Sequence, residues 1–254
     1  MRLWLSVVLS VSGMVAGCGD ALIEVDVPRS EGTDEIVGGV SFAGLPAVGA
    51  LTVGGSMYCS GTLIGPRKVL TAAHCLVGVL AAQMQFVFGA DAALPDDTRD
   101  VAGIEPHPGF DLRQITNDIG IVTLAADAPV APLGVNPSMD DSWIGTALLF
   151  VGYGVENGIT QTGAGRKRAV WMTISQVGST QFLYDDPGKN TCNGDSGGPA
   201  FFQDPQGTFL VAGTTSFGDL GCTSFGVDTR ADAFSSFIGA TGLAPPLRSS
   251  GGER

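Results

Sequence analysis

Ser196 lies in a glycine-rich loop at residues 192–199, a setting that suits a nucleophile. A serine hydroxyl near its free pKa is a weak nucleophile, so catalysis requires a nearby base and hydrogen-bond donors for the developing oxyanion. Glycine permits backbone conformations that a side chain would block, so the amide N–H groups of Gly194 and Ser196 can turn toward a reacting carbonyl. The loop by itself also fits an ordinary glycine-rich turn, and its interpretation depends on the rest of the chain.

The search for a base is short, because the chain contains only two histidines, His74 and His107. His74 ends an apolar run and stands beside Cys75. A disulfide from Cys75 to Cys59 would fix the backbone here, as a general base requires, and would contribute about 3 kcal/mol in the chain-entropy model. A buried structural histidine is the alternative for His74. His107 lies between two prolines, and we expect it to be an exposed loop residue.

Asp118 is the candidate third partner, since it directly precedes the apolar run at 119–124. A carboxylate in this position is costly unless it is paired. A histidine N–H is a suitable partner, because the carboxylate then fixes the tautomer and stabilises the imidazolium. In isolation, the same pattern also fits an aspartate that caps a strand.

The composition favours a loop-rich β protein that positions these residues. The 254 residues include 38 glycines and 14 prolines, only 15 % are charged, and the net charge is −12. This composition argues against a coiled coil and against a basic nucleic-acid-binding protein. Short apolar runs separated by turn residues predict antiparallel strands, which we place at 50–54, 59–64, 69–72, 84–88, 119–124, 147–151, 169–174, 200–202, 209–214 and 226–229. The one helical pattern is at 231–240, where Phe234, Phe237 and Ile238 share a face.

The N-terminal segment has the features of an export signal. Residues 1–18 combine a positive start with an apolar stretch too short for a membrane span. They end in VAGC, which resembles the lipobox of bacterial lipoproteins and would make Cys18 the lipidated mature N-terminus. An ordinary signal peptide cut nearby is the alternative. We expect residues 19–35 to be a propeptide or linker and residues 243–254 to be a disordered tail.

The five cysteines agree with this export hypothesis. If Cys18 carries lipid, four cysteines remain for two disulfides in an oxidising compartment. A zinc site is the rival interpretation, but the chain has no CxxC pair and few histidines. We expect no metal or other cofactor.

From Ile36 to about residue 240 the chain resembles the trypsin-like (chymotrypsin-fold) serine proteases. IVGG at 36–39 is similar to their activated N-terminus, TAAHC at 71–75 to their histidine motif, DIGI at 118–121 to their aspartate motif and GDSGGP at 194–199 to their serine motif. The order His, Asp, Ser is that of chymotrypsin. The resemblance implies an all-β protease domain at 36–242, with two packed six-stranded antiparallel barrels, a short C-terminal helix and a site in the cleft between the barrels.

The resemblance also implies a role for individual residues. Ser196 would be the nucleophile, His74 the general base, Asp118 its orienting partner, and the amides of Gly194 and Ser196 the oxyanion hole. Ser216 would support Asp118, residues 216–218 would pair with substrate as a strand, and Cys192 would form a disulfide with Cys222. Phe217 and Tyr153 stand where the family usually has tryptophan, and we expect both aromatic replacements to be tolerated.

Specificity is expected from Asn190, which matches the family's pocket base six residues before the nucleophile. A neutral residue there disfavours a buried basic P1 side chain, the substrate residue before the cleaved bond. Gly218 and Gly226 match the wall positions that leave the pocket open, so we expect a bulky apolar or uncharged polar P1. The loop around 223–225 is shorter than usual. Three carboxylates stay open as partners for a basic P1: Asp195, Asp219 and Asp228.

Activation is expected by cleavage after Glu35, which would free Ile36 to pair with Asp195. Family zymogens usually carry Lys or Arg before the cut, so the activating protease would be one that cleaves after Glu. Because Cys18 is the only cysteine before residue 36, the same cut would release the domain from a lipid anchor. The expected partners are therefore a protein or peptide substrate and an activating protease, with no nucleic acid and membrane contact only through Cys18.

Two alternatives from other classes remain: a catalytically silent protease-like surface-binding protein, and an uncut anchored adhesin. Such silent relatives typically lack a triad residue or the oxyanion glycine, and this chain has all of them. The acidic run that includes Asp91, Asp96, Asp97 and Asp100 hints weakly at calcium, and we expect a solvated loop instead.

Overall fold

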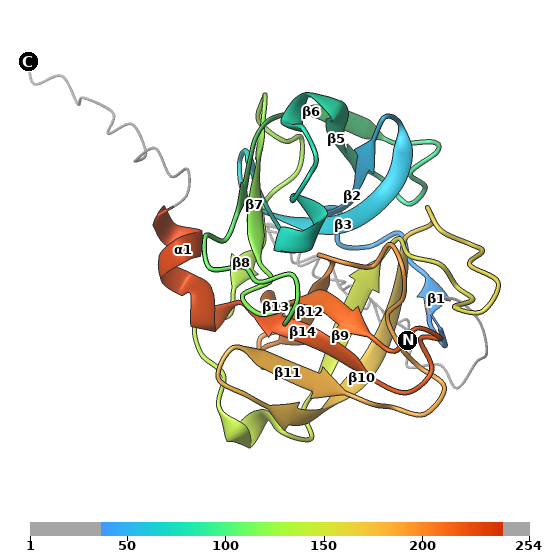
Figure 1. The fold of residues 1–254 in the computed structure, drawn as a ribbon, viewed down its shortest axis with the longest axis vertical. Helices are drawn as coiled ribbons and strands as arrows, with labels where there is room; N and C mark the ends of the chain where they lie inside the picture. The colour runs from blue at the N-terminus through green and yellow to red at the C-terminus, as the bar shows by residue number, and fades with distance from the viewer. Residues whose placement is uncertain (1–36, 241–254) are drawn as a thin grey trace, which may run out of the picture.

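The computed structural model describes residues 37–240. Its strands form two barrels, seen in Figure 1 as a blue-to-green unit above a yellow-to-orange unit. The predicted signal peptide (1–18), propeptide (19–35) and tail (243–254) lie outside the described residues, as does Ile36. No helix among residues 37–240 is both long and apolar enough to cross a bilayer.

The first barrel closes six antiparallel strands in the order β2-β3-β4-β7-β6-β5, with β5 pairing back to β2. Gly49 and Gly61 lie on neighbouring strands where a Cβ would overlap or crowd the Phe86 ring, so the large aromatic side chain in the barrel depends on small residues beside it. The strands are β2 (Val48–Val53), β3 (Ser56–Gly65), β4 (Lys68–Thr71), β5 (Met84–Phe88), β6 (Asp97–Pro106) and β7 (Gly120–Leu124).

The second barrel closes in the order β9-β10-β11-β14-β13-β12, with β12 pairing back to β9. Two short strands extend it: β1 (Val40–Ser41) pairs with β10, and β8 (Gly134–Val135) runs parallel to β13. Its six main strands are β9 (Ala147–Gly152), β10 (Arg168–Val177), β11 (Gln181–Tyr184), β12 (Pro199–Gln203), β13 (Phe209–Gly218) and β14 (Gly226–Arg230). The predicted fold class, two six-stranded antiparallel barrels with a short C-terminal helix, is confirmed.

One apolar cluster joins the barrels. It contains Val48 and Leu70 of the first barrel together with Val151 and Phe201 of the second, and all four are at most 2 % exposed. Burial of this kind contributes about 25 cal/mol per Å² of apolar surface removed from water. The two barrels are therefore held against each other by a shared core, which fixes the position of residues that each contributes to the groove between them.

The C-terminal helix is split into a 3₁₀ turn, η4 (Asp232–Phe234), and α1 (Ser235–Ala240). Phe234 and Ile238 are buried, as the helical pattern predicted. The expectation for His107 was wrong. Its ring is half-buried, packs edge-on against Phe234 and Phe237 at centroid distances of 5.0 and 4.9 Å, and has its pKa lowered by burial. His107 thus anchors the helix to the first barrel.

Candidate active site

Three segments bring the predicted catalytic residues to one cleft. His74 lies on the 3₁₀ turn η1 (Ala73–Cys75) that follows β4, Asp118 lies just before β7, and Ser196 lies in the loop before β12. His74 and Ser196 both line a cleft of about 310 Å³ whose other walls come from Leu112 and Ile115, from residues 191–193, and from residues 215–220 with Cys222. The first barrel therefore supplies the imidazole and carboxylate, and the second supplies the hydroxyl.

The carboxylate of Asp118 is fully buried and has three hydrogen-bond donors. Its Oδ2 accepts from Nδ1 of His74 at 2.7 Å and from the Ser216 hydroxyl at 2.6 Å. Its Oδ1 accepts from the backbone N–H of His74 at 2.8 Å. Together, these bonds compensate the cost of burying the charge and fix the imidazole, whose side chain remains 25 % exposed. A proton on Nδ1 leaves Nε2 with its lone pair available to accept another proton.

The loop around Ser196 is tied to both barrels. The Ser196 carbonyl accepts from the backbone N–H of Ser60 at 2.8 Å, and the Gly197 N–H donates to the Thr215 carbonyl at 2.7 Å. Within residues 37–240, the amide N–H groups of Gly194 and Ser196 have no acceptor. The Ser196 hydroxyl likewise makes no hydrogen bond to the His74 ring among the described residues. Both groups line the same cleft, and such bonds are often long before substrate binds.

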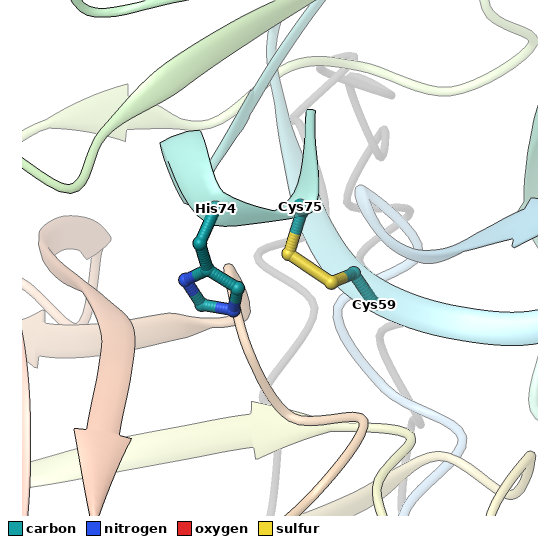
Figure 2. A group of neighbouring side chains, drawn as sticks. All are labelled: Cys59, His74 and Cys75. Carbon is teal, nitrogen blue, oxygen red and sulfur yellow. A yellow bond between two sulfur atoms is a disulfide. The ribbon is translucent and has the colours of Figure 1, made fainter. Parts of the chain in front are cut away.

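Both predicted disulfides are present, Cys59–Cys75 and Cys192–Cys222. Figure 2 shows the first of them beside the His74 side chain, with Cys75 and His74 projecting from the same turn. Among the described residues, these three are the only cluster with the spacing of a metal site. Sulfurs joined in a disulfide are not thiolate ligands, and Nδ1 of His74 is already bonded to Asp118. The Cys59–Cys75 disulfide therefore braces the turn that carries His74.

Asp195 is buried behind the Ser196 loop and accepts hydrogen bonds from two backbone N–H groups. Its Oδ1 accepts from Gly154 at 2.8 Å and its Oδ2 from Cys192 at 2.9 Å. Burial raises the pKa of Asp195 to about 6, although these two bonds and the charge of Arg168 act in the opposite direction. The carboxyl is thus only partly compensated by its described neighbours.

Comparison with known proteins agrees with this geometry. A family model described as Trypsin matches residues 36–238. The chain belongs to the trypsin family. Brachyurin of Leptuca pugilator is 31 % identical over 235 residues, covering 83 % of this chain and all of that protein. A protein named Trypsin from Saccharopolyspora erythraea is 28 % identical over 190 residues, covering 69 % of this chain and 81 % of that protein.

One relative shows that family membership alone does not establish activity. "Inactive CLIP domain-containing serine protease A28" of Anopheles gambiae is 28 % identical over 197 residues, covering 67 % of this chain and 51 % of that protein. For this member of the trypsin family, the assignment of catalysis therefore depends on the residues of the site itself.

The residues predicted to set specificity are only partly in the cleft. Ser216, Phe217 and Gly218 line it from β13, whereas Asn190 and Gly226 do not. Asn190 is 1 % exposed, and its amide N–H₂ donates to the Phe225 carbonyl at 3.0 Å and to Asp219 at 3.3 Å. It therefore braces the loop that follows β13 and is not one of the residues that line the cleft.

Asp219 organises that same loop. Its carboxylate accepts from the backbone N–H groups of Thr223, Ser224 and Phe225 and from the Thr223 hydroxyl. Desolvation raises the pKa of Asp219, but these hydrogen bonds outweigh it and lower the pKa to about 2. The short loop is thus a compact turn around one carboxylate, and the Cys192–Cys222 disulfide ties it to the opposite wall of the cleft.

Sequence reasoning missed several residues of the cleft. Thr191 lines it between Asn190 and Cys192, and its place next to the expected pocket base could have revealed it. Leu112, which is 63 % exposed, and Ile115 reach the cleft from the loop before Asp118, and no sequence motif marks them. Two of the acidic residues near 91–100 have side-chain partners: Asp97 pairs with Arg99 at 2.5 Å, and Asp100 accepts from Gln85 at 2.9 Å.

Proposed function

We propose that this chain is a serine endopeptidase in which Ser196 attacks the peptide carbonyl and forms an acyl-enzyme. The observation that carries the proposal is the hydrogen-bond network of Ser216, Asp118 and His74, which opens into the cleft that Ser196 lines. With Nδ1 donating to Asp118, Nε2 of His74 takes the proton from the Ser196 hydroxyl during attack. The same proton then passes to the leaving amine, and water repeats the sequence to release the acyl group.

The oxyanion formed in each step would be stabilised by the amide N–H groups of Gly194 and Ser196. Both lack another acceptor among residues 37–240, as groups reserved for a transient charge should. A donor of this kind is worth roughly 3–4 kcal/mol in the transition state. Residues 216–218, at the edge of the cleft on β13, would hold the substrate as an added antiparallel strand.

A fluorophosphonate probe tests the activity without knowledge of the substrate. We expect the protein to be labelled, Ser196→Ala to abolish labelling, and Ser179→Ala, an exposed serine with no described hydrogen bond, to leave it unchanged. Absence of labelling in the processed, folded protein would favour the alternative of a catalytically silent surface-binding protein.

We further propose that the chain is made as a zymogen. Cleavage between Glu35 and Ile36 would create an ammonium group able to pair with the buried Asp195, whose described partners compensate its charge only in part. The activator would be a protease that cleaves after Glu. Mass spectrometry of the labelled form tests this, because a mature N-terminus other than Ile36 contradicts it.

Export as a bacterial lipoprotein is proposed from residues 1–18 alone. Cys18 would carry the lipid, and cleavage before Ile36 would release the catalytic unit, since neither described disulfide reaches the propeptide. Membrane fractionation before and after cleavage tests this, with Cys18→Ser as the matched control that should never enter the membrane fraction.

A further inference from the structure

The ring of Tyr184 occupies the space in front of Gly226. Tyr184 on β11 pairs directly with Gly226 on β14, and its side chain is fully buried. A Cβ built on Gly226 would overlap Cε2, Cζ and the hydroxyl oxygen of this ring. The glycine therefore makes room for Tyr184, and it does not open the cleft to a large substrate side chain as expected from the sequence.

The Tyr184 hydroxyl lies between the cleft wall and a buried carboxyl. It is 2.6 Å from the hydroxyl of Thr191, which lines the cleft, and 3.1 Å from Oδ1 of Asp228, which does not. Thr191 and Asp228 are 7 % and 0 % exposed. These bonds hold the ring in one position, so substrate cannot displace it without breaking two buried hydrogen bonds.

We propose that Tyr184 closes the base of the specificity pocket and restricts P1 to small uncharged side chains such as Ala, Val and Thr. The inference depends on the proposed peptidase function. It predicts a shorter pocket than the one expected from glycines at positions 218 and 226. The walls remain those of the cleft, from Thr191 and Cys192 on one side and residues 215–218 on the other. The Tyr184 ring fills the space behind Thr191, on the side away from the cleft.

The buried carboxyl does not restore a preference for basic P1. Asp228 is fully buried and does not line the cleft; its Oδ1 accepts from the Tyr184 hydroxyl, and its Oδ2 is buried without a hydrogen-bond partner among the described residues. Burial raises the pKa of Asp228 well above its ordinary value, which disfavours the charged form. The Asp219 carboxylate already accepts hydrogen bonds from the backbone N–H groups of its own loop. A cation in the pocket would therefore meet the hydrogen-bonded carboxylate of Asp219 at the rim of the cleft, with Asp228 outside the lining.

The test uses chromogenic peptides that differ only at P1, with Ala, Val, Leu, Phe or Arg, on the full chain activated by a Glu-specific protease. Active sites are counted with the fluorophosphonate probe. For the unaltered protein, we expect kcat/KM for Ala or Val to exceed that for Phe and for Arg at least tenfold. For Tyr184→Ala, we expect the Phe-to-Ala ratio to rise at least tenfold. Tyr184→Phe keeps the ring and loses the two hydrogen bonds that fix it, so the Phe-to-Ala ratio should rise less than in Tyr184→Ala.

The possible results separate this inference from the proposed peptidase function. A labelled enzyme that prefers Phe, Leu or Arg overturns this inference and leaves the peptidase function standing. A folded protein that takes no label overturns both. If Tyr184→Ala does not fold, the P1 series on the unaltered protein still decides, because a large P1 accepted by that protein contradicts a closed pocket.

Discussion

Nδ1 of His74 lies 2.7 Å from Oδ2 of Asp118, and the same carboxylate also accepts from the backbone N–H of His74. One buried group thus fixes both the ring and the chain that carries it. Ser216 adds a third donor from the second barrel at 2.6 Å. The network therefore ties the position of the imidazole to the way the two barrels pack.

Asp118→Asn should lower kcat/KM by about 10³–10⁴. An amide that turns its N–H₂ toward His74 favours the wrong imidazole tautomer and no longer stabilises the imidazolium. The measurement is kcat/KM across pH, with circular dichroism to verify the fold. Asp127→Asn, an exposed carboxylate in the same barrel, should leave kcat/KM unchanged. A loss of less than tenfold in the folded Asp118 variant would contradict the assigned role.

Tyr153→Phe should lower the free energy of unfolding by about 1–3 kcal/mol and leave kcat unchanged. The buried Tyr153 hydroxyl, just after β9, lies 2.5 Å from the Gly89 carbonyl and 3.1 Å from the Val48 carbonyl of the first barrel. Removing it leaves buried acceptors without their donor. Urea denaturation measures the change, and Tyr58→Phe, at a tyrosine that is 40 % exposed, is the matched control. Equal stability of the two variants would show that this inter-barrel bond contributes nothing.

Gly197→Ala should destabilise the fold by roughly 3–5 kcal/mol, combining a strained backbone with overpacking. Gly197 has φ +77°, and a Cβ there would overlap Thr71 Oγ1 and lie 2.7 Å from the Ser60 carbonyl oxygen. Gly55→Ala separates the two effects, because Gly55 has φ +80° with nothing within 4 Å. That control should cost about 1 kcal/mol. Thermal unfolding of both variants measures the loss of stability. A loss at Gly197 no larger than that at Gly55 would contradict close packing behind Ser196.

The fold was largely predictable because ten of the strands contain apolar runs that are buried and bounded by turn residues. The strands that were missed explain the limit. In β6, only Val101 is buried and Asp97, Arg99 and Asp100 lie on the same strand, so it has no apolar run. In β11, four residues form a strand only because β10 and β14 pair with them. Such pairing depends on distant segments that local patterns do not contain.

The candidate catalytic residues could be located from the sequence because each lies in a short motif of distinctive composition. The specificity pocket was not, since its shape depends on contacts between separate strands. Asn190 turns toward Phe225, and Tyr184 fills the space in front of Gly226. Neither contact follows from the spacing of these residues around Ser196. His107 was misjudged for the same reason, because its partners come from the C-terminal helix.

Asp195 should make the uncut chain less stable as the pH rises. The pKa of Asp195 is raised by burial from its ordinary value of 3.8 to about 6. Between these values, the folded state holds a proton that the unfolded state has released, so the free energy of unfolding falls with pH. The full difference is about 3 kcal/mol, at 1.36 kcal/mol per pH unit.

The measurement is urea denaturation of uncut Ser196→Ala protein at several values between pH 4 and 7, with and without Asp195→Asn. The Asn variant removes this titration. Because the charge of Asp195 also raises the pKa of Asp228, the difference between the two proteins includes the loss of that repulsion. We expect the protein with Asp195 to lose about 2–3 kcal/mol relative to the Asn variant between pH 4 and 7, with little change above pH 7. After cleavage before Ile36, the new ammonium should remove that loss, because it pairs with the carboxylate and lowers its pKa. A difference between the two uncut proteins that stays constant with pH would show that Asp195 is already ionised and compensated, and that activation does not depend on relieving its burial.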